Sequence, residues 1–223
     1  MPAARELPAA HKEHKNVIVG YHIIFGMYGF WLPNDPRGSW SQFVGSRELY
    51  RVGPATKTTE RRSLAYRQHN LTQRLEAKKK LKHPSVVLTG IQARAVGRGF
   101  ARYFSRSGVA AWACAILSDH VHLVVGCGRY EVEKMVIGLK SRATAALKKE
   151  GIHPHNALRQ PTGSVAKCFA RGAWKVYLDP EDLDRAIRYV EKNPVKEGLP
   201  RQRWSFVTRI DPMLRSAPHS RRG

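Results

Sequence analysis

The chain has 223 residues and carries 39 Lys and Arg against 17 Asp and Glu, a formal net charge of +22 at pH 7. With 42% hydrophobic residues it can bury a core, which excludes a wholly disordered chain. Such a charge attracts polyanions, so we expect nucleic acid or an anionic membrane surface as partner, a basic protein without a partner being the alternative. No apolar stretch is long enough to span a membrane, and the first residues lack the apolar core of a signal peptide. We therefore expect a cytoplasmic protein, and of the two polyanions we expect nucleic acid rather than a membrane as its partner.

The first segments in chain order are a polar tail, a strand and a long insertion. Residues 1–16 show no periodicity and predict a flexible tail, whereas residues 16–29 are rich in the β-branched and aromatic side chains typical of a strand. Residues 28–60 mix Pro and Gly with aromatic side chains, among them Trp31 and Trp40. Aromatic side chains in a loop must pack on something, so we predict an ordered insertion.

Two helices are predicted next, over residues 59–83, ended by a proline, and over residues 89–107. In the second helix an arginine recurs every four residues, which places the arginines in one stripe opposite an apolar face. This pattern predicts a helix that buries one side and offers the other to DNA, although a merely solvated face is the alternative. The stripe consists of Arg94, Arg98, Arg102 and Arg106.

The second half of the chain alternates strands and helices. Residues 109–117 and 120–127 are two adjacent apolar runs with a short connection, which predicts an antiparallel hairpin. A helix is expected over residues 131–149, followed by a Pro- and Gly-rich connection and a short strand over residues 174–178. A last helix begins with acidic residues that suit its dipole, and we expect Asn193-Pro194 to end it.

The sequence His-Val-His places His120 and His122 on one face of a strand, because side chains alternate along a strand. Two imidazoles at this spacing can meet one metal ion. Two unrelated histidines on a half-exposed face are the alternative interpretation. Cys127 falls on the opposite face, so a third ligand must come from elsewhere in the chain.

Tyr189 and Asn193 stand four residues apart near the end of the last helix and therefore share a face, with Lys192 beside them. A metal ion can polarise a phosphate while a phenol attacks the phosphorus and forms a covalent phosphotyrosine. The amide oxygen of Asn193 could complete a His, His, Asn ligand set with open positions for phosphate oxygens. A tyrosine that only packs against the surface is the alternative.

These motifs resemble the HUH single-tyrosine transposases, specifically the REP-associated tyrosine transposase group. That group pairs a His-hydrophobe-His strand with a helix of the form Tyr-x-x-x-Asn-Pro-Val-x-x-Gly-Leu, which this chain matches over residues 189–199. The resemblance covers residues 17–207. It implies an α+β, ferredoxin-like domain with a central antiparallel sheet, a divalent metal ion, Mg²⁺ or Mn²⁺, at His120, His122 and Asn193, and Tyr189 as the catalytic nucleophile.

The resemblance further implies that single-stranded DNA is nicked and rejoined, with Tyr189 bonded to the 5′ phosphate, and that hairpin DNA is recognised. The chain departs from the family at Glu191, where a histidine is frequent, which leaves local details of the site open. Basic and aromatic side chains suit phosphate contacts and base stacking, although a purely structural role for the Trp-rich insertion stays open. The residues assigned to DNA binding are Arg94, Arg98, Arg102, Lys140, Arg142, Lys192, Trp31 and Trp40.

We therefore expect a transposase domain over residues 17–207, preceded by the tail at residues 1–16 and followed by a basic tail at residues 208–223. A monomer is expected rather than a homodimer. A non-cleaving protein that only binds hairpin or single-stranded DNA is one alternative, and an HUH nickase like those of replication initiation is another. The chain has no GxxxxGKS helicase motif, which disfavours the nickase.

Overall fold

The structure of the protein is a computed structural model that describes residues 17–59, 64 and 67–215. The predicted tail at residues 1–16 and the end of the predicted C-terminal tail, residues 216–223, lie outside the described residues. The strands and longer helices are β1 (Gly20–Gly26), α2 (Leu71–Lys79), α3 (Gly90–Ser107), β2 (Ala111–Ile116), β3 (His120–Gly126), α4 (Val132–Lys149), β4 (Trp174–Leu178) and α5 (Pro180–Lys196). Short helical segments are α1 (Arg47–Tyr50), η1 (Asn156–Leu158) and α6 (Pro212–Arg215).

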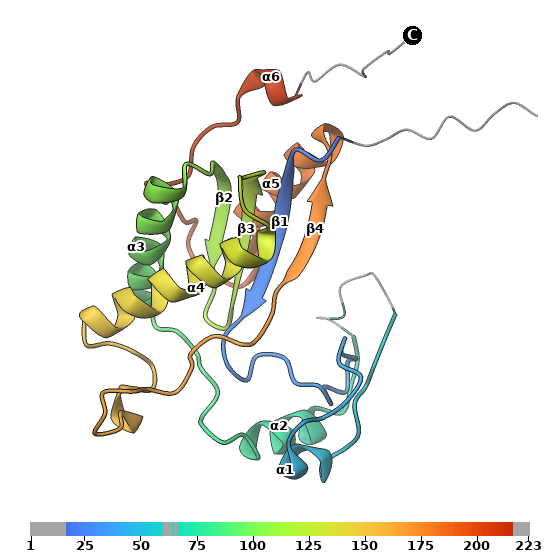
Figure 1. Ribbon diagram of the computed structural model, residues 1–223. Coiled ribbons are helices and arrows are strands. Elements are labelled where there is room, and N and C mark those ends of the chain that lie inside the picture. Colours follow the sequence, from blue (N-terminus) through green and yellow to red (C-terminus); the bar gives the residue numbers. More distant parts are fainter. Residues whose placement is uncertain (1–16, 60–63, 65–66, 216–223) are drawn as a thin grey trace, which may run out of the picture.

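The four strands form one sheet in the order β2-β3-β1-β4, and every neighbouring pair is antiparallel. Along the chain, β1, α3, β2, β3, α4 and β4 follow the β-α-β-β-α-β pattern of a ferredoxin-like fold. The predicted α+β, ferredoxin-like class with a central antiparallel sheet is therefore confirmed. Helices α1 and α2 lie in the segment between β1 and α3, and they sit apart from the sheet (Figure 1).

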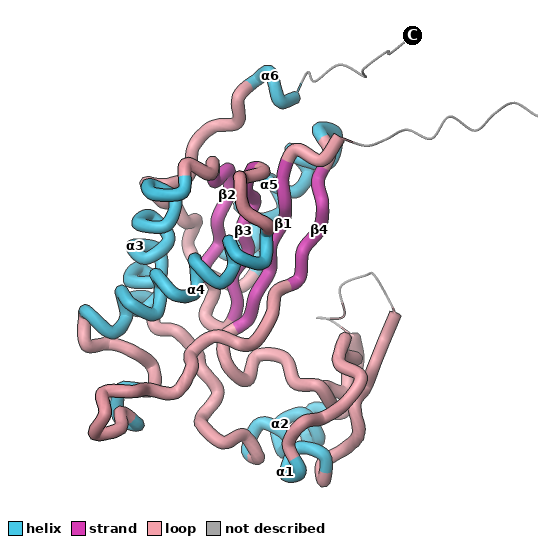
Figure 2. Tube along the Cα trace, viewed as in Figure 1, coloured by secondary structure: helices cyan, strands magenta, loops and turns pink. Residues whose placement is uncertain are grey.

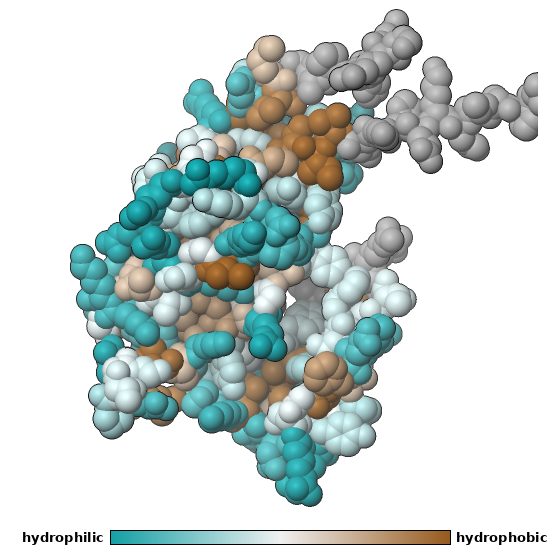
Figure 3. All heavy atoms as spheres, viewed as in Figure 1, coloured by the Kyte–Doolittle hydropathy of each residue, from teal (hydrophilic) through white to brown (hydrophobic). Residues whose placement is uncertain are grey.

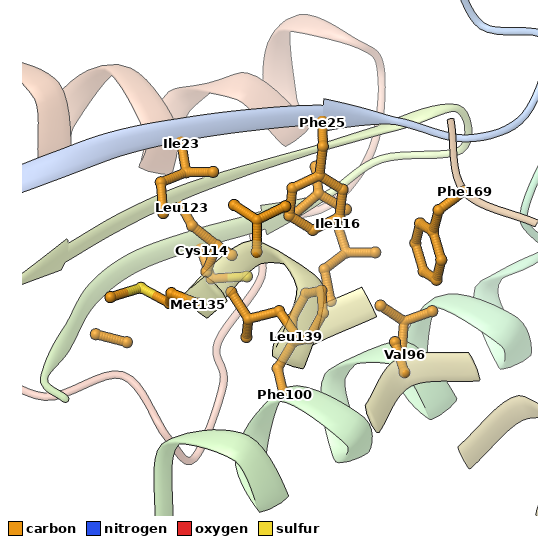
Figure 4. Packing of buried hydrophobic residues seen from close by; sticks show 14 of the residues in the cluster. Ile23, Phe25, Val96, Phe100, Cys114, Ile116, Leu123, Met135, Leu139 and Phe169 are labelled. Atoms are coloured by element: carbon orange, nitrogen blue, oxygen red, sulfur yellow. The ribbon is translucent and has the colours of Figure 1, made fainter. Parts of the chain in front are cut away.

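The sheet separates two layers of helices, because α3 and α4 cover one face and α5 lies on the other (Figure 1). Side chains alternate along a strand, so Ile23 and Phe25 of β1 and Leu123 of β3 point toward α3 and α4. All three are at most 2% exposed, and they pack against the apolar sides of the two helices (Figure 4). The outer surface of this layer is mostly hydrophilic (Figure 3). We call this side of the sheet the α3–α4 face.

On the other side of the sheet, which we call the α5 face, a second apolar cluster joins Val124 of β3 to Leu183 and Val190 of α5. The alternation that sends Leu123 toward α4 sends His120 and His122 toward α5. The cluster therefore fixes α5 over the half of the sheet that carries the two histidines.

Local sequence explains the predicted helix over residues 89–107, observed as α3. The side chain of Thr89 accepts a hydrogen bond from the backbone of Gln92, and the side chain of Gln92 accepts one from the backbone of Thr89. Gly108 ends the helix in the left-handed conformation with φ 68°. A Cβ atom on Gly99 would lie 2.5 Å from the Cα atom of Ala143, so only glycine allows α3 and α4 to cross this closely.

The bounds of two predicted helices are wrong. Of the helix predicted over residues 59–83, residues 60–63 and 65–66 lie outside the described residues, and the helix observed is only α2. It begins at Leu71 because the side chain of Asn70 caps it by accepting from the backbone of Gln73. Helix α5, expected to end at Asn193-Pro194, continues to Lys196. Asn193 and Pro194 are both buried, and this packing outweighs the proline's missing backbone donor.

The insertion predicted over residues 28–60 is ordered where it is described, and it is mostly loop (Figure 2). It has a small apolar cluster of its own in which Leu32 and Leu49 contact Ala77 of α2. Asp35 and Arg37 form a buried ion pair with Oδ2 and Nη2 2.8 Å apart. The described part of the insertion therefore packs together with α2 as a unit beside the sheet.

Part of the predicted C-terminal tail packs on the domain. The backbone of Thr208 donates to the carbonyl of Ala111 over 2.8 Å, and Ile210 is 7% exposed in the cluster under α5. Ordered packing therefore continues beyond the domain boundary expected at residue 207. In the described part of the chain, no helix is both long and apolar enough to cross a membrane.

Candidate active site

The two predicted histidines lie at the start of β3, on the α5 face. His122 is 5% exposed, while His120 is half-buried and stacks on Phe30, with ring centroids 4.7 Å apart. Nδ1 of His120 lies 2.8 Å from Oδ1 of Asp119, so this ring nitrogen is occupied by the carboxylate. Phe30 belongs to the insertion, which therefore reaches the site.

The predicted nucleophile Tyr189 lies beside these histidines. Its ring centroid is 5.7 Å from that of His122 in an edge contact, and the side chain is exposed, so its phenol can meet a substrate from solvent. Nζ of Lys196 lies 4.9 Å from the centroid of the Tyr189 ring. Lys196 therefore holds a positive charge next to the Tyr189 ring. Lys192, which was predicted to bind DNA, lies one helical turn before Lys196 and is exposed.

A third histidine, which the sequence reasoning did not select, completes this cluster. Ile24 of β1 pairs with His122 across the sheet, so His22 is the diagonal neighbour of His122 on the same face. Nε2 of His22 lies 3.0 Å from Nδ1 of His122. The His22 ring also makes an edge contact with Tyr189, with ring centroids 5.8 Å apart. Period-two alternation alone could have placed His22 on one face of its strand, but only the pairing of β1 with β3 identifies its partner.

The electrostatics of the cluster keep two rings neutral. Burial lowers the pKa of His122 to about 2, with the nearby His120 and His22 rings adding to the effect. Burial alone lowers the pKa of His22 to about 4. Both imidazoles are therefore uncharged at neutral pH, which is the form that binds a metal ion.

The predicted third ligand, Asn193, is 7% exposed on the side of α5 that faces the sheet. Helix α5 starts directly after β4 and folds back over the sheet, so it runs opposite to β4 and to the parallel β3. The step from Tyr189 to Asn193, about 6 Å, therefore leads the same way as the step of about 7 Å from His122 to His120. This register brings Asn193 toward His120.

The donor set suits a divalent cation. Nδ2 of Asn193 is buried and has no hydrogen-bond partner among the described residues. Because the oxygen and nitrogen of an amide can exchange places by a flip, this position can instead present the oxygen. The amide oxygen is a ligand type that Mg²⁺ and Mn²⁺ prefer, and imidazole is a common ligand of divalent transition metals. No three His, Cys, Asp or Glu side chains among the described residues could hold a metal ion, so the set depends on Asn193.

The basic residues predicted to bind DNA lie in different places. Arg94, Arg102 and Arg142 are exposed on the outer side of α3 and α4, on the far side of the sheet from Tyr189. Arg98 pairs there with Glu150. Nζ of Lys140 donates to the carbonyls of Ala170 and Gly172, so this ammonium is used inside the protein.

The two tryptophans predicted to bind DNA also differ. Trp31 donates to the carbonyl of Gly38 over 2.8 Å, and the guanidinium carbon of Arg37 lies 3.7 Å from its ring centroid. Trp31 therefore holds the insertion together. Trp40 is 52% exposed, and its ring contacts that of Trp174, with ring centroids 4.4 Å apart. Trp174 pairs with Ile24, which pairs with His122, so the Trp174 side chain lies on the α5 face. It is two strands from His122 and on the strand next to that of His22.

Comparison with known proteins gives two structural likenesses. Neither a known protein family nor a curated protein matches the chain. Among solved structures, it is similar to a REP-associated tyrosine transposase bound to a REP hairpin, with 12% identity, a TM-score of 0.44, and 92% of this chain and 81% of that one covered. It is also similar to a predicted transposase from Deinococcus radiodurans R1, with 11% identity, a TM-score of 0.39, and 85% and 97% covered.

Both are described as transposases. Transposases are also the class of protein that the His-Val-His and Asn-Pro-Val motifs resemble.

Proposed function

We propose that the protein is a metal-dependent transposase that nicks and rejoins single-stranded DNA through a covalent bond to Tyr189. One observation carries the proposal: the exposed phenol of Tyr189 lies beside the buried, neutral His122 of the His-Val-His strand, with ring centroids 5.7 Å apart. A protein that only binds DNA has no need for a nucleophile beside a candidate metal site.

In the proposed reaction the Tyr189 oxygen attacks the phosphorus of a DNA phosphodiester. The bond from phosphorus to the 3′ oxygen breaks, the 3′ oxygen takes a proton, and the tyrosine retains the 5′ phosphate while its own proton passes to solvent. A free 3′ hydroxyl can later reverse these steps and join strands. Because one phosphoester replaces another, no external energy source is needed.

His120, His122 and Asn193 would hold a divalent metal ion, Mg²⁺ or Mn²⁺, which when bound polarises the phosphate under attack. Asp119 orients the His120 ring through its 2.8 Å contact with Nδ1. The Lys196 ammonium beside Tyr189 adds positive charge where the phosphate must approach.

The DNA partner is proposed to be a single strand next to a hairpin of the REP type. The net charge of +22 supports a polyanion, and the exposed Trp40 beside Trp174 offers an aromatic surface for unpaired bases. Tyr189 contacts the histidines of its own chain, which supports a monomer as the active form.

The test is the formation of a covalent adduct. Purified protein with Mn²⁺ and a labelled strand that contains a hairpin should give a protein-DNA species that survives denaturing electrophoresis. The Tyr189→Phe variant should give no detectable adduct, since only the attacking oxygen is lost. Tyr177→Phe is the matched control, because Tyr177 is also exposed but lies on the opposite side of the sheet.

An adduct formed equally well by Tyr189→Phe would contradict the proposal. A wild-type protein that binds the hairpin tightly but never cleaves it would instead favour the non-cleaving binding protein. Adduct formation on any single strand, with or without a hairpin, would favour the nickase.

A further inference from the structure

We propose that His22 is a positioning residue that fixes the ring of His122, so that Nε2 of His122 is the nitrogen presented to the metal ion. This inference rests on the proposed function for the ligand role of His122. It adds a residue from β1 to a site that the two sequence motifs place only on β3 and α5.

The contact between the two rings is specific. Nε2 of His22 and Nδ1 of His122 are 3.0 Å apart, which is hydrogen-bond distance, and the rings are stacked with centroids 5.3 Å apart. One nitrogen must donate and the other accept. A His122 ring that binds metal through Nε2 needs its proton on Nδ1, so Nδ1 donates and Nε2 of His22 accepts.

The neighbouring histidine has the same arrangement with a different acceptor. Nδ1 of His120 lies 2.8 Å from Oδ1 of Asp119, as Nδ1 of His122 lies beside His22. In both rings Nδ1 is engaged by an acceptor and Nε2 is left for a ligand. The site thus uses a carboxylate to orient the half-buried His120 and a neutral imidazole to orient the buried His122.

The environment explains why the acceptor next to His122 is neutral. A carboxylate in this buried position, with its own charge to solvate, would be costly. A neutral imidazole accepts the hydrogen bond without that cost. His22 belongs to β1, a central strand that pairs with β3, so the backbone of the sheet holds the His22 side chain next to His122.

A role for His22 as a third metal ligand fits the structure less well. Among the described residues, no three His, Cys, Asp or Glu side chains are placed so that they could hold a metal ion together. The three histidines His22, His120 and His122 are therefore not such a set. The nitrogen of His22 that meets His122 is engaged with Nδ1, on the far side of the ring from Nε2.

The tautomer of His122 gives a direct test that needs neither metal nor catalysis. Long-range ¹H-¹⁵N NMR spectra of the metal-free, full-length protein at neutral pH should show His122 protonated at Nδ1. The same tautomer should persist in His22→Gln, because a glutamine can place its amide oxygen close to the position of Nε2. In His22→Leu, which has no acceptor, the Nε2 tautomer should become prominent. An Nε2 tautomer of His122 in the wild-type protein would overturn the proposal, even where the protein forms the tyrosine adduct.

Metal affinity gives the second readout. Titration calorimetry with Mn²⁺ alone should show binding weakened about 10- to 100-fold in His22→Leu, the usual cost of losing such a partner. His22→Gln should remain within a few-fold of wild type, and the thermal unfolding of all three metal-free proteins identifies any variant that fails to fold. Equal affinity of His22→Leu and wild type would overturn the proposal, as would an equal loss in His22→Gln and His22→Leu. Absence of both Mn²⁺ binding and adduct in the wild-type protein would instead refute the proposed function.

Discussion

The two faces of the sheet differ in what they contribute to the protein. On the α3–α4 face, strand residues such as Ile23 and Leu123 are fully buried under two helices, and the helices carry arginines on their outer side. On the α5 face a single helix covers the sheet, and the rings of His22 and His122 meet the exposed Tyr189 of that helix. The first face builds the fold and carries charge, and the second carries the candidate chemistry.

This difference means that abundance of charge and location of chemistry are separate features of the molecule. The arginine stripe of α3 lies across the sheet from Tyr189, so it cannot touch the phosphate under attack. It can hold another part of the same DNA, such as a hairpin stem, through phosphate contacts that extend beyond the site. Variants on each face should therefore change different measurements.

The largest effect is expected from the α5 face. His120→Ala removes a proposed metal ligand, so adduct formation should fall at least about 100-fold. Affinity for the hairpin strand, measured by fluorescence anisotropy, should change little, because the residues proposed to bind DNA lie elsewhere. A parallel loss of affinity and cleavage would indicate that His120 supports the fold through its stack on Phe30 rather than the chemistry.

An intermediate effect is expected from the two tryptophans of the insertion. Trp40→Ala should weaken binding of a single strand by about 5- to 150-fold, since stacking contributes roughly 1–3 kcal/mol per base. Trp31→Ala should instead lower the free energy of unfolding in urea by about 3 kcal/mol, because its ring packs on Arg37. Trp40→Ala with unchanged affinity would show that the pair with Trp174 is purely structural.

The smallest effect is expected from the α3–α4 face. The double variant Arg94→Gln, Arg102→Gln should bind the hairpin a few-fold more weakly. The slope of log affinity against log salt concentration should decrease in magnitude by roughly 1.8, for two lost duplex phosphate contacts. Adduct yield at saturating DNA should equal that of the wild type. A lower yield under those conditions would mean that the two faces are coupled.

Much of this architecture could be predicted from the sequence, because the signals are local. Two adjacent apolar runs with a short connection predicted the hairpin of β2 and β3, and strand alternation predicted the shared face of His120 and His122. Helical spacing predicted the shared face of Tyr189 and Asn193. Helix α3 begins within a residue of its expected start, at the capping box of Thr89 and Gln92. The bounds of α2 failed because charged residues in this stretch give little periodicity, so the cap at Asn70 decides where the helix begins.

The sequence by itself determined which residues could react and on which side of each element they lie, since these depend only on residue type and period. Tertiary structure alone decided that β1 pairs with β3, which sets Nε2 of His22 3.0 Å from His122. It also decided that α5 continues through Pro194, that Trp31 is internal while Trp40 is exposed, and that the arginine stripe faces away from Tyr189. Strand order and layer packing are set by contacts between residues far apart in the chain, and a local pattern carries no information about them.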